Sequence, residues 1–228
     1  MKVSDSIFQF HKPKGPIQLE VVFVHGLVDD NCGDAYWKTW LTRDCTPDSV
    51  WPRTWLPVEF PFAQIFALKY DASKKRTHTS GRRDLFTLGE LLACEMVELG
   101  RIGQSGVPVV FVCHAFGGLV AKQIIVWAKE RGSQNTNFRN LFQNIGGFCF
   151  YSTPHHGTIL RTSSSGSFSF PGGERSPLLN NDEVLNKEIC RLNSAFEQAK
   201  QNSWCIQSIA ETHATSQVNN YYGIWILV

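Results

Sequence analysis

One strand-to-helix segment holds the residues whose spacing is most typical of a catalytic site. The apolar run Val107–Cys113 leads into Cys113-His-Ala-Phe-Gly117, and an apolar helical pattern follows. This segment matches the nucleophile-elbow pattern Gly-x-Ser-x-Gly, with Cys113 in place of the first glycine and Ala115 in place of the serine. The turn is so tight that the residues two before and two after its apex must be small. The pattern therefore indicates nucleophilic acyl transfer, at a position that carries no nucleophile.

Two backbone N–H groups are the candidate oxyanion donors. Position 115 begins a helix, where unpaired N–H groups and the helix dipole favour negative charge, so the N–H of Phe116 is one donor. The second is the N–H of Leu27, because His25-Gly26-Leu27 follows the apolar run Leu19–Val24. An ordinary glycine-containing turn would explain either motif alone. Both motifs together, at the ends of two buried strands, favour a catalytic site.

Apolar runs and helical patterns alternate along the chain. The strands and helices that they predict position the candidate site residues. Strands are predicted at 19–24, 65–70, 107–113, 145–151, 204–210 and 221–228, and amphipathic or buried helices at 85–99, 119–128 and 184–196. Continuous apolar strands are typical of parallel sheets that are buried on both faces. The alternation predicts an α/β fold with a doubly wound, mostly parallel sheet, formed by a single domain over residues 1–228.

Four sequence blocks together carry a resemblance to a known family. They are Val22-Phe-Val-His-Gly-Leu27, the elbow with its following Gly-Gly-Leu-Val-Ala-Lys-Gln123, Phe150-Tyr-Ser-Thr-Pro-His-His-Gly157, and the tryptophan-rich stretch from Trp51 to Asp71. The chain resembles the serine esterase and lipase-like α/β-hydrolases, and most closely the serine active site-containing protein family. The resemblance implies an α/β-hydrolase fold and hydrolysis of carboxylic acyl esters without a cofactor or a metal.

The resemblance also implies where an acid and a base would lie. The acid would follow the next-to-last strand, where Glu211 is the candidate; the alternative is a solvated carboxylate at a strand end. The base histidine would follow the last strand, and the sequence ends at Val228 within that strand. We therefore expect the fold to be truncated at its C-terminus and the chain to be part of a longer protein. His213 would lie on the acid's own loop and does not fit the triad order.

The remaining candidate residues line the expected pocket. The family carries residues of these types in the oxyanion loop, in the elbow and in a Thr-Pro-His block that shapes the pocket wall. They are His25, Gly26, His114, Gly117, Gly118, His155 and His156. A structural role is favoured for His155 and His156, packing and hydrogen-bonding roles are implied for His25 and His114, and none occupies the position of the base.

Other chemistries find little support in the sequence. There is no metal-binding histidine or cysteine spacing and no phosphate-binding glycine loop. The net charge of +2 provides no basic stripe for nucleic acid. No window reaches the ~18 apolar residues of a transmembrane segment, and the N-terminus lacks the apolar core of a secretory signal. Cys113, Cys149 and Cys205 lie in strand-like runs, which favours free thiols and a cytoplasmic location.

Alanine at the apex leaves three interpretations open. The parent protein is an active hydrolase whose serine was replaced, a natural pseudo-hydrolase that binds or scaffolds, or a module of a larger signalling protein. The intact glycines and oxyanion loop favour the first, and the missing nucleophile and base favour the second. In each case the expected ligand is an apolar acyl-ester small molecule or lipid. Further domains of a longer protein are also expected as partners.

A Ser/Gly/Pro-rich stretch at 158–181 precedes an amphipathic helix, and together they predict a lid or cap segment over 158–200. Limited proteolysis should therefore cut first within 158–181 and leave the core intact, as judged by mass spectrometry of the fragments. Cleavage mainly at 72–82, where Lys, Arg and Ser also cluster, would contradict this assignment.

Overall fold

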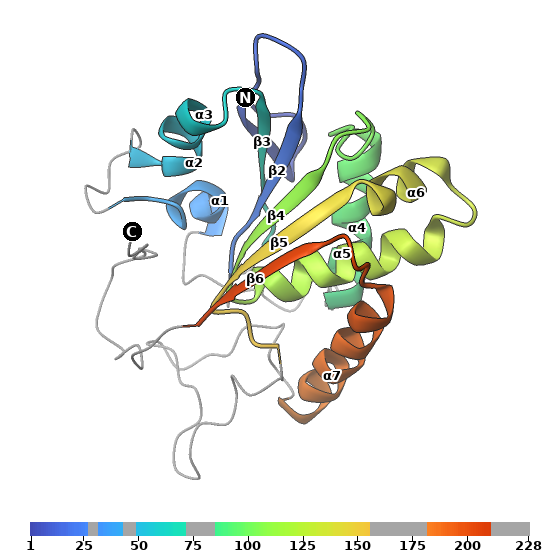
Figure 1. Cartoon of the computed structure of the whole chain (residues 1–228). Helices are drawn as coiled ribbons and strands as arrows, with labels where there is room; N and C mark the ends of the chain where they lie inside the picture. The colour runs from blue at the N-terminus through green and yellow to red at the C-terminus, as the bar shows by residue number, and fades with distance from the viewer. Residues whose placement is uncertain (27–31, 43–48, 72–84, 156–181, 211–228) are drawn as a thin grey trace.

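In the part of the chain that the structure describes, six strands form one mixed sheet. The computed structural model describes residues 1–26, 32–42, 49–71, 85–155 and 182–210. The strand order is β1-β3-β2-β4-β5-β6, in which β1 pairs antiparallel with β3 and every other pairing is parallel (Figure 1). The predicted α/β class and mostly parallel sheet are confirmed.

For the five predicted strands that the structure describes, the boundaries agree with the hydrophobic pattern to within two residues. The strands are β1 (Ile7–His11), β2 (Leu19–Val24), β3 (Ala63–Leu68), β4 (Val109–His114), β5 (Ile145–Tyr151) and β6 (Cys205–Ile209). Strand β1 was not predicted, because it is a short antiparallel edge strand in which Gln9 and His11 interrupt the apolar run. The strand predicted at 221–228 lies outside the described residues.

Three long helices confirm the three helical patterns. They are α4 (Leu85–Glu98), α5 (Gly117–Arg131) and α7 (Asp182–Ala199). The structure adds short elements that have too few residues to show a period: η1 (Cys32–Asp34), α1 (Ala35–Lys38), α2 (Trp51–Thr54) and α3 (Leu56–Glu59). It also adds α6 (Thr136–Gln143), which was not predicted although it buries Phe138 and Leu141 three positions apart. Helix α6 begins where the Asn135 side chain accepts a hydrogen bond from the N–H of Asn137 at 2.8 Å.

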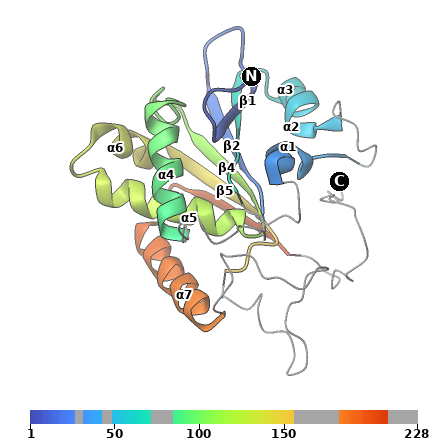
Figure 2. The ribbon, with the colours of Figure 1, turned by 180° about the vertical axis from the view of Figure 1, so that it is seen from behind.

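The sheet separates two hydrophobic cores. Because side chains alternate along a strand, Val22 and Val24 of β2 pack with α4 and α5, whereas Val21 and Phe23 pack with the layer that contains α1–α3. The short helices are held by aromatic packing, with Phe23 4.8 Å from Trp40 between ring centroids. Figures 1 and 2 show α4–α7 on one face of the sheet and α1–α3 on the other.

Helix α7 belongs to the larger core. Its residues Ile189, Leu192 and Phe196 are buried with β5 and α5, and the Phe196 ring lies edge-on to Phe148 at 5.2 Å. The described part of the predicted lid segment is therefore packed on the body of the domain. Residues 156–181 lie outside the described residues, so the lid itself stays a prediction.

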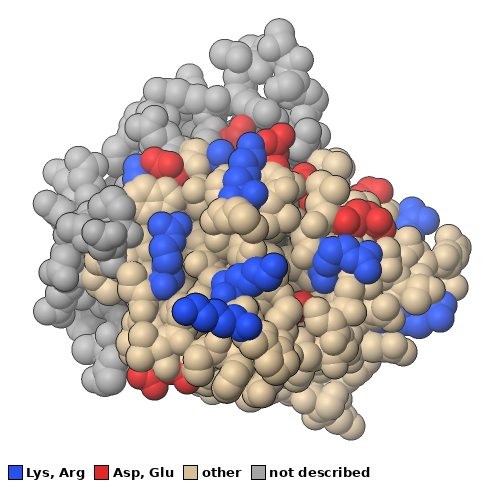
Figure 3. Space-filling view, turned by 90° about the horizontal axis from the view of Figure 1, so that it is seen from above, with Lys and Arg blue, Asp and Glu red and all other residues tan. Residues whose placement is uncertain are grey.

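The surface at the β1–β2 end of the molecule has mixed character. Figure 3, which views this end, shows Lys and Arg side chains interspersed with uncharged and acidic ones. Near the same end, Trp55, Val58, Phe60 and Phe62 are exposed apolar side chains. Among the described helices, none is long and apolar enough to span a bilayer.

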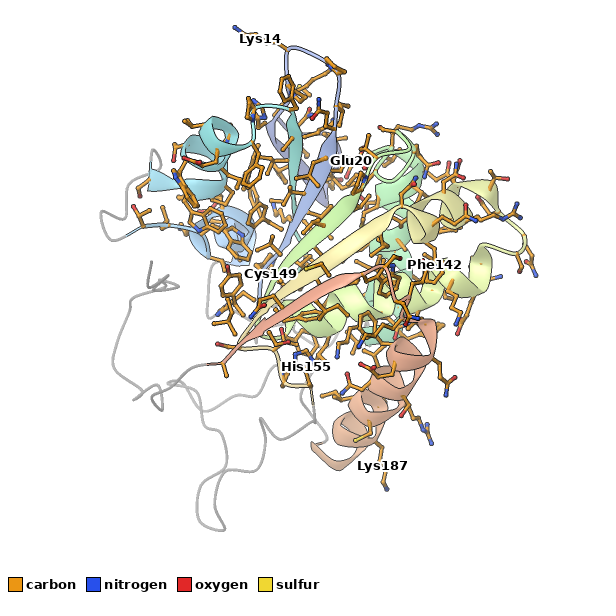
Figure 4. The ribbon with its side chains drawn as sticks, viewed as in Figure 1. Lys14, Glu20, Phe142, Cys149, His155 and Lys187 are labelled. Atoms are coloured by element: carbon orange, nitrogen blue, oxygen red, sulfur yellow. The ribbon has the colours of Figure 1, made fainter. Side chains whose placement is uncertain are left out.

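Glu20 is a buried carboxylate at the amino end of β2 (Figure 4). Its oxygens accept hydrogen bonds from the N–H of Gly103 at 2.6 Å and from the Ser105 hydroxyl at 3.0 Å, which anchors the turn before β4. Burial raises the pKa of this carboxyl group, while the two hydrogen bonds oppose that shift.

Replacing Glu20 with alanine should lower the free energy of unfolding by about 1–3 kcal/mol, because the Gly103 N–H loses its acceptor. Glutamine has nearly the same shape as glutamate and keeps one acceptor oxygen. Glu20→Gln should therefore lower the free energy of unfolding by less than half as much as Glu20→Ala. Urea unfolding of the two variants tests this, and equal losses would show that the hydrogen bonds are not what stabilises the turn.

Candidate active site

The turn between β4 and α5 consists of Ala115 and Phe116. Strand β4 ends at His114, and α5 begins at Gly117. Ala115 has φ +48°, a left-handed conformation that is uncommon for a residue with a side chain. A sharp strand-to-helix turn with a strained residue at its apex is the geometry that an elbow requires to expose a nucleophile.

Hydrogen bonds from neighbouring elements hold the apex in place. The Ala115 N–H donates to the Tyr151 carbonyl at the end of β5 at 2.8 Å, and the Ala115 carbonyl accepts from Gly118 at 3.1 Å. The Phe116 carbonyl accepts from the N–H groups of Leu119 and Val120. Within the described part of the chain, no carbonyl accepts from the Phe116 N–H, so this group remains available at the start of the helix.

Two glycines allow the start of α5 to approach the sheet. A Cβ atom at Gly117 would lie under 3.0 Å from the backbone oxygens of Val24 and His25. A Cβ atom at Gly118 would lie under 3.0 Å from the Thr153 hydroxyl. The glycines therefore bring the end of β2, the apex and the turn after β5 into direct contact.

Gly26 lies against the apex from the other side. A Cβ atom there would lie 3.1 Å from the Ala115 Cβ and 3.2 Å from the His114 Nδ1. The loop after β2 and the elbow are therefore neighbours, as an oxyanion site assembled from both would need. Leu27, the predicted second donor, lies outside the described residues, as do His156, Glu211 and His213. The oxyanion pair and the acid therefore stay predictions.

His25 is fully buried and neutral. Its Nδ1 lies 2.7 Å from the Gly26 carbonyl, its Nε2 lies 3.5 Å from the Tyr70 N–H, and its ring stacks on Tyr70 with centroids 4.1 Å apart. One donating and one accepting nitrogen define a neutral imidazole. Burial lowers the pKa of His25 to about 4. Together with the Tyr70 hydroxyl, which donates to the His25 carbonyl, this ring shapes the loop and does not act as a base.

Cys113 lies two residues before the apex and is not a substitute nucleophile. Its side chain is buried in the core between the sheet and α5. Burial raises the pKa of the thiol well above its ordinary value, so the reactive thiolate is suppressed.

His155 follows β5 and is half-buried next to a lysine that the sequence did not single out. Its Nδ1 lies 2.8 Å from Nζ of Lys122, which is a buried residue of α5. The only sequence signal for Lys122 is one charge in the middle of an apolar helical run. Within the described ranges, no three His, Cys, Asp or Glu side chains come close enough to hold a metal ion.

The sheet order, the elbow and the neighbouring Gly26 loop define the chain as an α/β-hydrolase. Residues 18–171 match the family described as "Putative serine esterase (DUF676)", and the chain belongs to that family. The resemblance found in the sequence blocks is thus confirmed.

Curated relatives carry the name Protein SERAC1. The zebrafish (Danio rerio) protein is 30% identical over 94% of this chain and 34% of its own length, and the bovine (Bos taurus) protein is 31% identical over 70% and 25%. The chain thus spans between a quarter and a third of those relatives. Among solved structures, the Bacillus licheniformis lipase BlEst2 is similar with a TM-score of 0.49 and 15% identity, over 85% of this chain and 64% of that one.

Because His25 stays neutral in the fold down to about pH 4, acid should destabilise the protein. The unfolded chain takes up this proton near pH 6.5, so stability is lost as the pH falls from about 6.5 towards 4. The His25 contribution to the free energy of unfolding should fall by about 2 kcal/mol between about pH 7.5 and 5. Urea unfolding at both pH values should show this loss, and His25→Gln should lack it. An identical pH dependence in the two proteins would contradict the assignment.

Proposed function

We propose that the chain is the hydrolase domain of a serine-type carboxylic-ester hydrolase, disabled as it stands by Ala115. The observation that carries the proposal is the left-handed Ala115 at the apex, in contact with Gly26 and bonded to Tyr151. Without a hydroxyl at this position no acyl-enzyme bond can form. Loss of the serine typically removes about a million-fold of the rate. The domain then binds an ester without cleaving it.

The proposed ligand is an ester with an apolar acyl part. Phe116 is buried beside the apex, and the first turn of α5 is apolar. The available Phe116 N–H would bind the ester oxygen, and charge developing on that oxygen strengthens such a bond. The family description as a serine esterase supports the same chemistry.

A second candidate function is a natural pseudo-hydrolase that binds a ligand within a larger protein. Alanine at the apex favours it, and so does the length of the relatives, of which this chain spans only 25–34%. Free thiols at Cys94, Cys113, Cys149, Cys190 and Cys205 support a reducing, cytoplasmic location for either function.

The variant Ala115→Ser distinguishes between the two proposed functions. In a longer protein that also carries the C-terminal segment with the expected base histidine, a serine hydroxyl at the apex should become covalently labelled by a fluorophosphonate ester and should cleave short p-nitrophenyl esters. The same protein with Ala115 retained should do neither. Intact-mass spectrometry and absorbance of nitrophenolate measure the two outcomes. Ala128→Ser, which places a hydroxyl farther along the same helix, is the matched control.

A folded Ala115→Ser protein that includes the C-terminal segment and is still neither labelled nor active would favour the pseudo-hydrolase. Cleavage confined to phosphoesters or peptides would contradict the proposed ester class.

A further inference from the structure

Lys122 is a charged side chain in a place where charge is costly. It is only 3% exposed, on a helix whose buried residues are mostly apolar. Removing an ammonium group from water costs free energy unless its protons are accepted. Its Nζ lies 2.8 Å from Nδ1 of His155 and 2.7 Å from Oδ1 of Asn193 on α7. Both of these acceptors are neutral groups, and they come from different elements.

Two aromatic rings complete the surroundings of this ammonium group. The Phe150 ring of β5 has its centroid 5.5 Å from Nζ, and the Phe196 ring of α7 lies at 5.0 Å. Ring faces attract a cation at these distances, and more strongly where water is excluded. The site is therefore built to hold a cation.

The hydrogen bonds continue from Lys122 to two further elements. The Asn193 amide donates to the His155 carbonyl, and Nε2 of His155 lies 3.3 Å from the Ser208 hydroxyl on β6. Figure 4 shows His155 between the carboxyl end of the sheet and α7. One lysine thus connects α5, α7, β6 and the post-β5 turn, which we define as residues 152–155.

This network determines which nitrogen of His155 carries the proton. An ammonium group can only donate, so Nδ1 must accept and the ring proton must lie on Nε2. The post-β5 turn is also in contact with the elbow, since Thr153 occupies the space beside Gly118. Gly118 and Lys122 are four residues apart and lie on one face of α5. The missing side chain at Gly118 leaves space for Thr153 of this turn, and Lys122 donates a hydrogen bond to His155 of the same turn.

We propose that Lys122 is a positioning residue of the candidate active site, whose ammonium group fixes His155 in the Nε2–H tautomer and holds the post-β5 turn against the elbow. The proposal rests on the proposed function only in that it treats this turn as a wall of the ester site. Ser208 lies on the strand that leads towards the predicted acid position, so the network also reaches the end of β6.

The network depends on the charge of Lys122. Burial lowers the pKa of this amine to about 8, while Glu197 of α7 favours the charged form. Cys113 of β4 is a neutral thiol at this pH, because burial raises its pKa. His155 faces the amine from the post-β5 turn, beside the neutral Asn193 and the two rings. Below about pH 8 the ammonium group donates to Nδ1, and above it the neutral amine can accept a proton from Nδ1 instead.

Nitrogen NMR of ¹⁵N-histidine protein tests the proposal, because the shifts of the two ring nitrogens report which one is protonated. The His155 signals are identified by their loss in His155→Gln. At about pH 7 the unmodified chain should show the Nε2–H tautomer, and raising the pH should change the ratio with a midpoint near 8. Lys122→Met should raise the share of the Nδ1–H form several-fold and should shift the amide signals of Gly117 and Gly118.

Two variants make the result specific to the ammonium group at this position. Lys122→Arg keeps a donor cation and should restore the Nε2–H tautomer and remove the change near pH 8. Lys129→Met removes an exposed lysine that also contacts α7 from α5, through the Gln198 carbonyl, and should leave every signal of His155 unchanged. An unaltered His155 tautomer in Lys122→Met overturns the proposal. If that variant does not fold, a predominantly Nδ1–H tautomer of His155 in the unmodified chain at about pH 7 overturns it, because Nδ1 could then not accept from the ammonium group.

None of these measurements needs turnover. A folded Ala115→Ser protein that includes the C-terminal segment and is neither labelled nor active would count against the proposed hydrolase, whereas the NMR result decides the role of Lys122 by itself.

Discussion

The first turn of α5 lies between the ends of β2 and β5 because two consecutive residues there have no side chain. The backbone oxygens of Val24 and His25 occupy the space beside Gly117, and Thr153 occupies the space beside Gly118. Any larger residue at either position would push the helix away from the sheet. The contact between Gly26 and Ala115, the hydrogen bond from Ala115 to Tyr151 and the binding of His155 by Lys122 all require this close approach.

The elbow is therefore maintained by its surroundings and not by the residue at its apex. Ala115 adopts a left-handed backbone that would suit glycine better, and it does so because β5 and α5 hold its N–H and its carbonyl. Strain at one position is tolerated where neighbouring contacts determine the conformation. An alanine at the apex can remove the reaction while leaving the framework of the site in place.

The elements with strong local signals were predictable, and those that depend on distant contacts were not. Strand β2 and the elbow could be predicted because apolar runs and small residues act within a few positions of the sequence. Helices α1–α3 are too short to show a period and depend on Trp40 and Trp51 packing around Phe23. The role of Lys122 could not be predicted, because its partners His155 and Asn193 lie 33 and 71 positions away along the chain.

The alternation of β2 between the two cores limits how this strand can change. Val22 and Val24 contribute to one core, and Val21 and Phe23 contribute to the other. Inserting or deleting one residue would exchange the two sets and would also move Gly26 relative to the apex. We therefore expect insertions and deletions to be confined to the connections outside this strand, and the spacing from β2 to Gly26 to be constant wherever this elbow is retained.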